Sequence, residues 1–173
     1  MKAAIDAVAL ELRDGRRVTV RAIRETDAEL LQDAIGRLSV ESSYRRFFSP
    51  LRTLPRQLLE RATHPEAGRE LQLVAVVGEG DDETIVAGAR YAALAEQGDC
   101  EFAVAVVDDW HGYGLARRML EIVMGHARAG GFARMEGYVL ATNAAMLGLA
   151  KRLGFTESAS SEGPTVRMVR RAL

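Results

Sequence analysis

The feature that most constrains this chain is an abrupt change of hydrophobic period within residues 102–127. The continuous apolar run FAVAVV (102–107) is typical of a buried strand, and LARRMLEIVMGHA (115–127) repeats with helical spacing. Gly112 and Gly114, one residue apart, lie between them. A strand that turns through glycine into a helix leaves the first backbone N–H groups of the helix unpaired, at the positive end of its dipole. The joint is therefore a candidate phosphate site.

The rest of the chain predicts one sheet with helices packed on it. Apolar alternation and β-branched residues predict strands at 16–23, 71–78, 84–94, 100–107, 134–140 and 165–173. Helical spacing predicts helices at 27–37, 55–62, 114–129 and 143–153. Thr26 or Asp27 is expected to cap the first helix and Asn143 the last, and 39–55 is expected to form a connecting region.

The order of these elements predicts an α+β or α/β single domain with a mixed sheet flanked by helices. The strands between residues 71 and 107 follow one another through short turns, so they are expected to form an antiparallel meander. Residues 1–15 are expected to form an N-terminal arm or short strand, and 16–173 the domain.

Composition excludes several classes of function. The net charge of −1 gives no basic field for nucleic acid, and no apolar run approaches the ~20 residues of a membrane span. We therefore expect a cytoplasmic protein without nucleic-acid or membrane partners. Cys100 is the only cysteine and the three histidines are widely spaced, so no metal site is expected.

The glycine joint alone fits more than one kind of protein. A dinucleotide fingerprint needs a third small residue where this chain has Arg117, although Glu136 lies about the right distance downstream for a ribose. A P-loop needs a Gly-Lys-Ser/Thr run that is absent here. A plain strand–turn–helix joint without a ligand also remains open.

Three segments together resemble the GNAT superfamily of N-acetyltransferases. HGYGLA (111–116) is similar to the family's acetyl-CoA loop, with histidine at the opening position where glutamine or arginine is usual. NAAMLGLAKRLGF (143–155) resembles the family's helix that ends in Gly-Phe, and VAV (104–106) falls on the strand that pairs with the pantetheine arm. The resemblance covers about 17–173.

This resemblance implies a GNAT-like α/β/α sandwich with a mostly antiparallel sheet whose strands splay at an acetyl-CoA cleft. It implies acetyl-CoA as cosubstrate and no metal. The cofactor-binding residues that it implies are Val104, Ala105, Val106, His111, Gly112, Tyr113, Gly114, Leu115, Ala116, Arg117 and Asn143.

A narrower resemblance concerns the acceptor. RLSVESSYRRFF (37–48), 101–120 and 140–155 look like the acetyltransferase domains linked to acyl-CoA-synthetase-like regions, which act on protein lysines. It implies a protein lysine as the amine acceptor; a homodimer is left open. Residues 66–101 also hold nine acids against Arg69 and Arg90, and a negative rim of this kind would steer a cationic amine in a salt-dependent way.

Glu101 is the candidate catalytic residue. A lysine amine attacks only when neutral, which costs about 4.6 kcal/mol at pH 7, so a general base is needed. Glu101 is a lone charge in EFAVAVV, and the resembling subfamily places its base glutamate there. A solvent-facing glutamate is the alternative. Many GNAT enzymes carry a tyrosine acid where this chain has Ala150, so no residue is assigned to protonate the leaving thiolate.

The residues thus predict an acetyl-CoA-dependent N-acetyltransferase that uses direct attack. Three alternatives remain: a CoA-sensing or interaction module of the same fold without turnover, an acetyltransferase for small-molecule amines, and a dinucleotide oxidoreductase.

Overall fold

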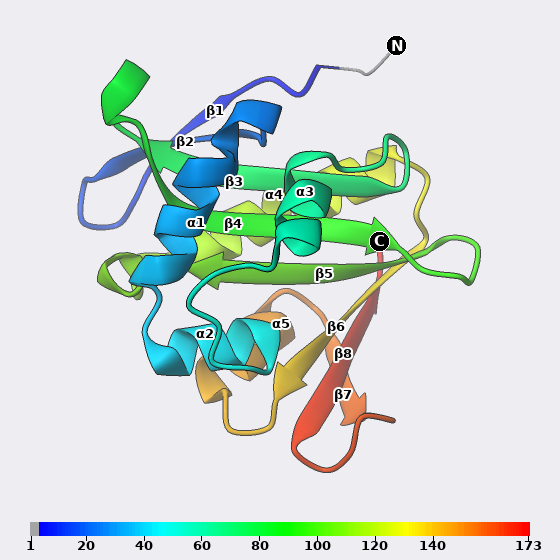
Figure 1. The fold of residues 1–173 in the computed structure, drawn as a ribbon. Helices are drawn as coiled ribbons and strands as arrows, with labels where there is room; N and C mark the ends of the chain where they lie inside the picture. The colour runs from blue at the N-terminus through cyan, green and yellow to red at the C-terminus, as the bar shows by residue number, and fades with distance from the viewer. Residues whose placement is uncertain (1–3) are drawn as a thin grey trace.

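The computed structural model describes residues 4–173; residues 1–3 of the expected arm lie outside the described residues. One eight-stranded sheet in the order β1-β2-β3-β4-β5-β6-β8-β7 forms the middle layer (Figure 1). All neighbouring strands are antiparallel except β5 and β6, which are parallel. The strands are β1 (Val8–Glu11), β2 (Arg17–Ala22), β3 (Glu70–Val77), β4 (Thr84–Ala93), β5 (Asp99–Val106), β6 (Arg134–Leu140), β7 (Thr156–Ala159) and β8 (Val166–Ala172).

Within residues 4–173, five α-helices cover the two faces of this sheet. They are α1 (Ala28–Arg37), α2 (Val40–Phe47), α3 (Arg56–Thr63), α4 (Leu115–Ala129) and α5 (Ala144–Arg152). One core cluster joins the sheet to α4 and α5, and a second joins the opposite face to α1 and α3. The predicted mixed sheet, its antiparallel meander β3–β4–β5 and the α/β/α layering are confirmed.

The prediction that 39–55 is only a connecting region is wrong, because residues 40–47 form α2. Ser39 caps this helix through a bond from the N–H of Ser42 to its hydroxyl (3.0 Å). Asp108, distant in sequence, also accepts from the N–H of Ser39 (3.0 Å) and the hydroxyl of Ser42 (3.1 Å). The cap therefore fixes α2 beside the end of β5.

Two further differences have simple causes. Asp27 precedes α1 by position, but its carboxylate makes no cap bond; it accepts from the guanidinium of Arg21 (2.7 and 3.0 Å) and the N–H of Arg24 (2.7 Å). Strand β7 was missed because its four residues are all exposed and show no apolar alternation. Asn143 caps α5 as predicted, since its side chain accepts from the N–H of Met146 (3.2 Å).

The parallel strands β5 and β6 separate after a short paired segment. Their register joins only three pairs, the last being Glu101 with Glu136, although both strands continue further. Figure 1 shows β6 diverging from β5. Phe102, the next residue of β5, packs so closely on Gly137 of β6 that a Cβ at Gly137 would lie 2.5 Å from its ring. The ring thus sits where the strands part.

We expect Gly137→Ala to destabilise the protein by about 1–3 kcal/mol, because the added methyl overpacks against a ring that is only 5% exposed. Urea unfolding measures the change. Gly125→Ala is the matched control: Gly125 is exposed inside α4 with open space at its Cβ, so this variant should be about 0.5–1 kcal/mol more stable. Parental stability in Gly137→Ala would contradict the close packing. Adding Phe102→Leu to Gly137→Ala should recover part of the lost stability.

Candidate active site

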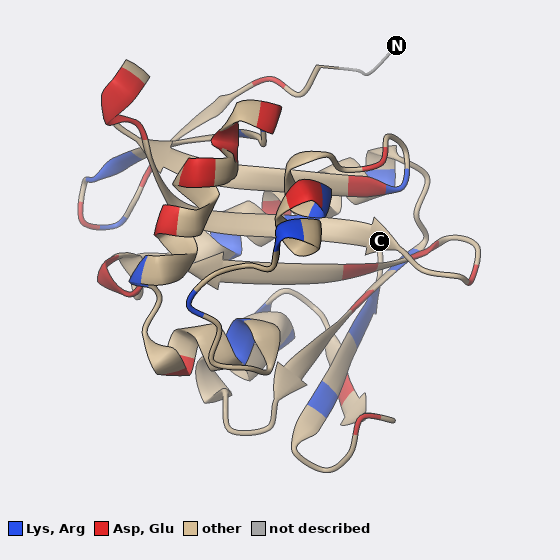
Figure 2. Ribbon diagram, viewed as in Figure 1, with Lys and Arg blue, Asp and Glu red and all other residues tan. Residues whose placement is uncertain are grey.

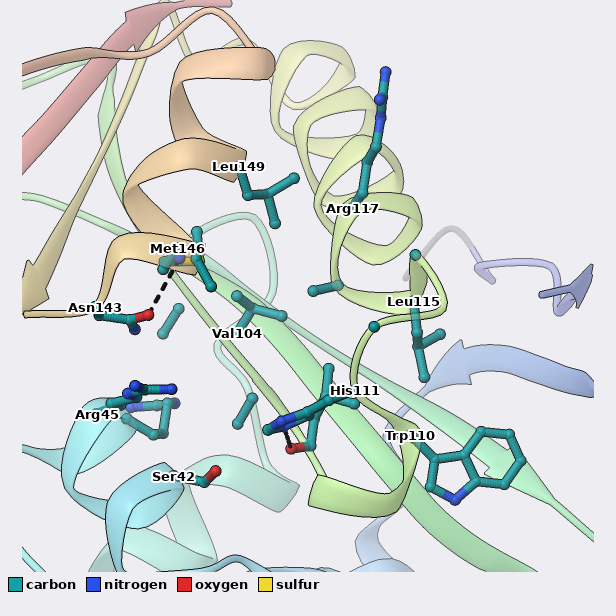
Figure 3. Close-up of a pocket in the computed structure, with 18 of the residues that line it drawn as sticks. Ser42, Arg45, Val104, Trp110, His111, Leu115, Arg117, Asn143, Met146 and Leu149 are labelled. Atoms are coloured by element: carbon teal, nitrogen blue, oxygen red, sulfur yellow. Dashed lines mark hydrogen bonds between the residues drawn. The ribbon is translucent and has the colours of Figure 1, made fainter. Parts of the chain in front are cut away.

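A cavity of about 860 Å³ opens where β5 and β6 part. It is bounded by β5, the β5–α4 loop, the start of α4, and side chains of α2 and α5 (Figure 3). All twelve residues proposed from the sequence line it: Glu101, Val104, Ala105, Val106, His111, Gly112, Tyr113, Gly114, Leu115, Ala116, Arg117 and Asn143. The fold therefore gathers residues that span more than forty positions of the chain.

The free edge of β5 faces this cavity. The N–H of Val107 donates to the carbonyl of Val86 in β4 (2.9 Å), so Val107 points its backbone groups away from the cavity. Backbone groups alternate in direction along a strand, and the N–H and C=O groups of Val106 and Val104 accordingly point into the gap left by β6. An extended ligand could pair with Val104 as a strand would.

The glycine joint has the geometry of an anion site. Gly112 and Gly114 adopt φ of 84° and 88°, which residues with side chains rarely adopt, and Gly114 is the N-cap of α4 without any side-chain cap. The first paired N–H of the helix belongs to Arg118, which donates to Gly114 (3.1 Å). The N–H groups of 115–117 precede this bond and lie at the positive end of the helix dipole.

The His111 side chain bonds to the protein backbone, whereas a contact with a phosphate was expected. Its Nε2 lies 2.6 Å from the carbonyl oxygen of Val106, as the dashed line in Figure 3 shows, so this nitrogen donates to the strand and is not free for a phosphate. The bond closes the turn between β5 and α4. It also occupies the Val106 carbonyl, so Val104 is the position on this edge at which both the N–H and the C=O stay open.

The β1–β2 hairpin supports the loop from outside, a contact that the sequence did not predict. The guanidinium of Arg16 lies 3.8 Å from the ring centroid of Trp110 and 4.7 Å from that of Tyr113. The same group bonds to the carbonyl of Asp109 (3.3 Å), and the N–H of Arg13 donates to the carbonyl of Tyr113 (3.4 Å). Arg16 is far from Trp110 and Tyr113 in the sequence, so no spacing pattern predicts that they come into contact.

Glu101 lies at the point where the strands part and has no hydrogen-bond or ion-pair partner among residues 4–173. Burial, and then the nearby charge of Glu136, raises the pKa of Glu101, while Arg90 and Arg46 oppose the shift. Glu136 itself is held by Arg170 (2.6 Å). A half-buried, unpaired carboxylate with a raised pKa has the properties of a general base.

Residues on α5 and β6 complete the wall opposite α2. Asn143, which caps α5, and Met146 and Leu149 of α5 face the cavity in Figure 3, whereas Ala150 is buried in the core (1% exposed) and lies outside the cavity lining. Tyr138 of β6 also lines the cavity, a position for which the sequence predicted no role. Partial burial, then Glu136 and Glu101, raises its pKa, so its hydroxyl keeps its proton at neutral pH.

The expected negative rim is absent from this lining, so that prediction is wrong. Of the nine acids in 66–101 only Glu101 lines the cavity, together with Glu11 of β1. Arginines are the charged residues that dominate it instead: Arg13, Arg45, Arg46, Arg117, Arg118 and Arg152. The acidic hairpin after β3 forms η2 (Gly80–Asp82), which projects away from the sheet (Figure 2). Cation steering by the hairpin thus has no structural basis.

Fold and cavity together define a GNAT acetyltransferase, and comparison with known proteins shows the same. The family model described as "Acetyltransferase (GNAT) domain" matches residues 17–156. The chain belongs to this family and is an N-acetyltransferase.

Individual relatives agree with that assignment. The acetyltransferase PA5475 of Pseudomonas aeruginosa is 34% identical over 162 residues, which are 94% of this chain and 87% of the relative. The crystal structure of the GNAT domain of S. lividans PAT is 30% identical and has a TM-score of 0.88, covering 96% of this chain and 97% of that one. A cAMP-binding acyltransferase from Mycobacterium smegmatis is 25% identical with a TM-score of 0.64; the match covers 97% of this chain and 47% of that one.

The family uses acetyl-CoA, and the site fits it. The cavity joins small loop residues at a helix N-terminus to an open strand edge, and a Cβ built on Gly112 would have no heavy atom within 4 Å apart from those of Gly112 and its two chain neighbours. Within residues 4–173 no helix has the length and apolar character to cross a membrane. The same residues contain no cluster of three or more potential metal-binding His, Cys, Asp or Glu side chains.

Proposed function

We propose that this enzyme transfers acetyl from acetyl-CoA to a protein lysine, with Glu101 as general base. The observation that carries the proposal is the Glu101 carboxylate, which has no hydrogen-bond or ion-pair partner within residues 4–173. Glu101 is the last residue of β5 in register with β6, and it lines the cleft. The narrower resemblance of 37–48, 101–120 and 140–155 to domains that act on protein lysines supports the acceptor.

The residues of the cleft would hold the cosubstrate along β5. The N–H groups at the start of α4 would bind its phosphates, and the small residues Gly112 and Gly114 allow close approach. The open N–H and C=O of Val104 would pair with the extended pantetheine arm. Asn143 would line the cleft while its carboxamide oxygen remains the cap of α5.

Acetyl-CoA supplies an acetyl group activated as a thioester. Glu101 would accept a proton from the acceptor ammonium, directly or through water, so that the nitrogen lone pair can attack the carbonyl carbon. A main-chain N–H on the open edge of β5 would donate to the carbonyl oxygen as negative charge grows there. The C–S bond of the tetrahedral adduct then breaks and the sulfur leaves as a thiolate, while the nitrogen gives up its second proton to become the amide. The thiolate would take up a proton, either the one released by the nitrogen or one donated by Tyr138, whose protonated hydroxyl lines the cavity and would then be reprotonated from the nitrogen.

An acceptor screen tests the proposal. Release of CoA thiol is measured with acetyl-CoA and a panel of lysine-containing proteins, peptides, polyamines and aminoglycosides, and mass spectrometry locates the acetyl group. Acetylation of protein or peptide lysine is the expected result. Turnover restricted to small amines would contradict the lysine acceptor, and tight acetyl-CoA binding without turnover on any acceptor would favour a sensing module.

The raised pKa of Glu101 predicts the acid side of the pH profile. Glu101 acts as a base only when ionised, so kcat/KM should fall as the pH drops through its pKa. Because burial and the acids Glu136 and Glu162 outweigh Arg90 and Arg46, this fall should occur above the ordinary value of 4.5. Initial rates between pH 4 and 8 locate the limb. Glu101→Gln should remove it, and a limb that survives that substitution would assign the titration to another group.

A further inference from the structure

Three arginine–glutamate pairs neutralise most of the charged groups near Glu101, whereas Arg46 and Glu162 form no ion pair within residues 4–173. Each pair joins an arginine to a glutamate within 3.4 Å: Arg45–Glu41 (2.6 Å), Arg90–Glu70 (3.4 Å) and Arg170–Glu136 (2.6 Å). Arg46, on α2, makes no hydrogen bond and no ion pair with any residue in the described part of the chain. Its guanidinium therefore lines the cavity as an unmatched cation, as Glu101 lines it as an unmatched anion.

Arg46 is held in place without being neutralised. Its guanidinium lies 4.7 Å from the ring centroid of Phe47, a contact that supports the planar group while leaving its N–H donors free. The residue is half-buried between α2 and β5. Burial, and then repulsion by Arg90, lowers the pKa of Arg46 to about 10. A partly buried cation without a partner is costly, so the site favours an anion that arrives with a ligand.

The place of Arg46 indicates which ligand brings that anion. Arg46 lies close enough to Glu101 for the two charges to affect one another's pKa. The phosphate loop begins after Val106, five strand residues and about 17 Å further along β5. Other cavity arginines, Arg117 and Arg118, lie at that far end. Arg46 is thus placed beside the acceptor amine rather than beside the phosphates.

We propose that Arg46 binds a carboxylate next to the acceptor amine, so that the enzyme prefers lysines flanked by an acidic residue. This inference rests on the proposed lysine acceptor. The fork of N–H donors on a guanidinium matches both oxygens of a carboxylate, while Glu101 receives the ammonium. The unpaired charges of Arg46 and Glu101 then select an acceptor that carries the two opposite charges.

Three peptides that differ only beside one lysine test this preference. The lysine is flanked by glutamate, glutamine or arginine, and kcat/KM is measured with saturating acetyl-CoA. For the unsubstituted enzyme we expect the glutamate peptide to exceed the glutamine peptide by about tenfold, with the arginine peptide lowest. Arg46→Met should remove the preference, and Arg46→Glu should reverse it toward the arginine peptide.

Controls separate specificity from loss of structure. Arg45→Met, one residue away on the same helix but already paired with Glu41, should keep the glutamate preference. Acetyl-CoA affinity, measured by calorimetry, should be unchanged in the Arg46 variants. The peptide comparison with the unsubstituted enzyme needs no variant, so it remains decisive if Arg46→Met folds poorly.

The outcomes distinguish this inference from the proposed function. Equal use of the three peptides, or a preference that survives Arg46→Met, overturns the role of Arg46 and leaves lysine acetylation standing. If no peptide is acetylated, free lysine is compared with cadaverine, its decarboxylated analogue. An Arg46-dependent preference for free lysine would show that the carboxylate belongs to the reacting molecule itself, which overturns both the flanking residue and the protein acceptor.

Discussion

Glu101→Gln should lower kcat/KM at neutral pH by about 10²–10⁴-fold, the usual cost of losing a general base. Glutamine keeps the shape of the side chain at the parting of β5 and β6 but cannot accept the ammonium proton. Acetyl-CoA affinity should change little, because Glu101 lies away from the glycine loop. Activity should partly recover at high pH, where the amine loses its proton to solvent. Steady-state kinetics from pH 7 to 10 and calorimetric binding of acetyl-CoA measure these effects.

Glu136→Gln is the sharpest comparison for that variant. Glu136 is the register partner of Glu101 on β6, but Arg170 already holds its carboxylate. Its loss should lower the pKa of Glu101, because one source of repulsion is removed, and should leave kcat/KM near pH 7 within about tenfold of the parent. Parental turnover in Glu101→Gln together with a large loss of kcat/KM in Glu136→Gln would place the base on β6 and contradict the assignment of Glu101.

Gly114→Val should weaken acetyl-CoA binding by at least about 100-fold, or about 2.7 kcal/mol. Gly114 has φ of 88° at the N-cap of α4, so a β-branched residue forces this turn to rearrange and places methyl groups over the first N–H groups of the helix. A Cβ there also meets the guanidinium of Arg13 at 3.4 Å. Calorimetry with acetyl-CoA gives the affinity directly.

Gly131→Val separates backbone strain from ligand crowding. Gly131 has φ of 87° just after the other end of α4, with open space at its Cβ, and it does not line the cavity. Both variants should lose thermal stability through the left-handed conformation, but only Gly114→Val should lose acetyl-CoA affinity. If Gly114→Val binds as tightly as Gly131→Val, the phosphates do not lie at this loop.

The sequence predicted the elements that have strong periodicity and missed those that do not. Strands β3 to β6 and helix α4 are buried along one face or both, so apolar spacing located them within a few residues. Helix α2 lacks such a face, since Ser43 is its one buried residue. A signal existed there: Ser39 is a favourable N-cap, and Glu41 with Arg45 forms an i, i+4 pair.

The site was predictable where residues follow one another and unpredictable where distant segments meet. The glycine loop, β5 and Asn143 came from contiguous motifs, and all line the cavity. The support of the loop by Arg16 and the free charge of Arg46 depend on which partners the fold brings near, which no spacing rule states. The prediction of a negative rim failed for the same reason: the acids of the hairpin are near Glu101 in the sequence, but they do not line the cavity.

The free edge of β5 also bears on solubility. An unpaired strand edge is a template on which a strand of another protein molecule can add, and such edges promote aggregation. Here the edge lies inside a cleft, with Ser42 and Arg45 of α2 on one side and Met146 and Leu149 of α5 on the other (Figure 3). A cleft walled in this way admits a thin extended arm but obstructs a whole strand with its side chains. The helices that shape the cleft would thereby also protect the empty enzyme from self-association through its sheet.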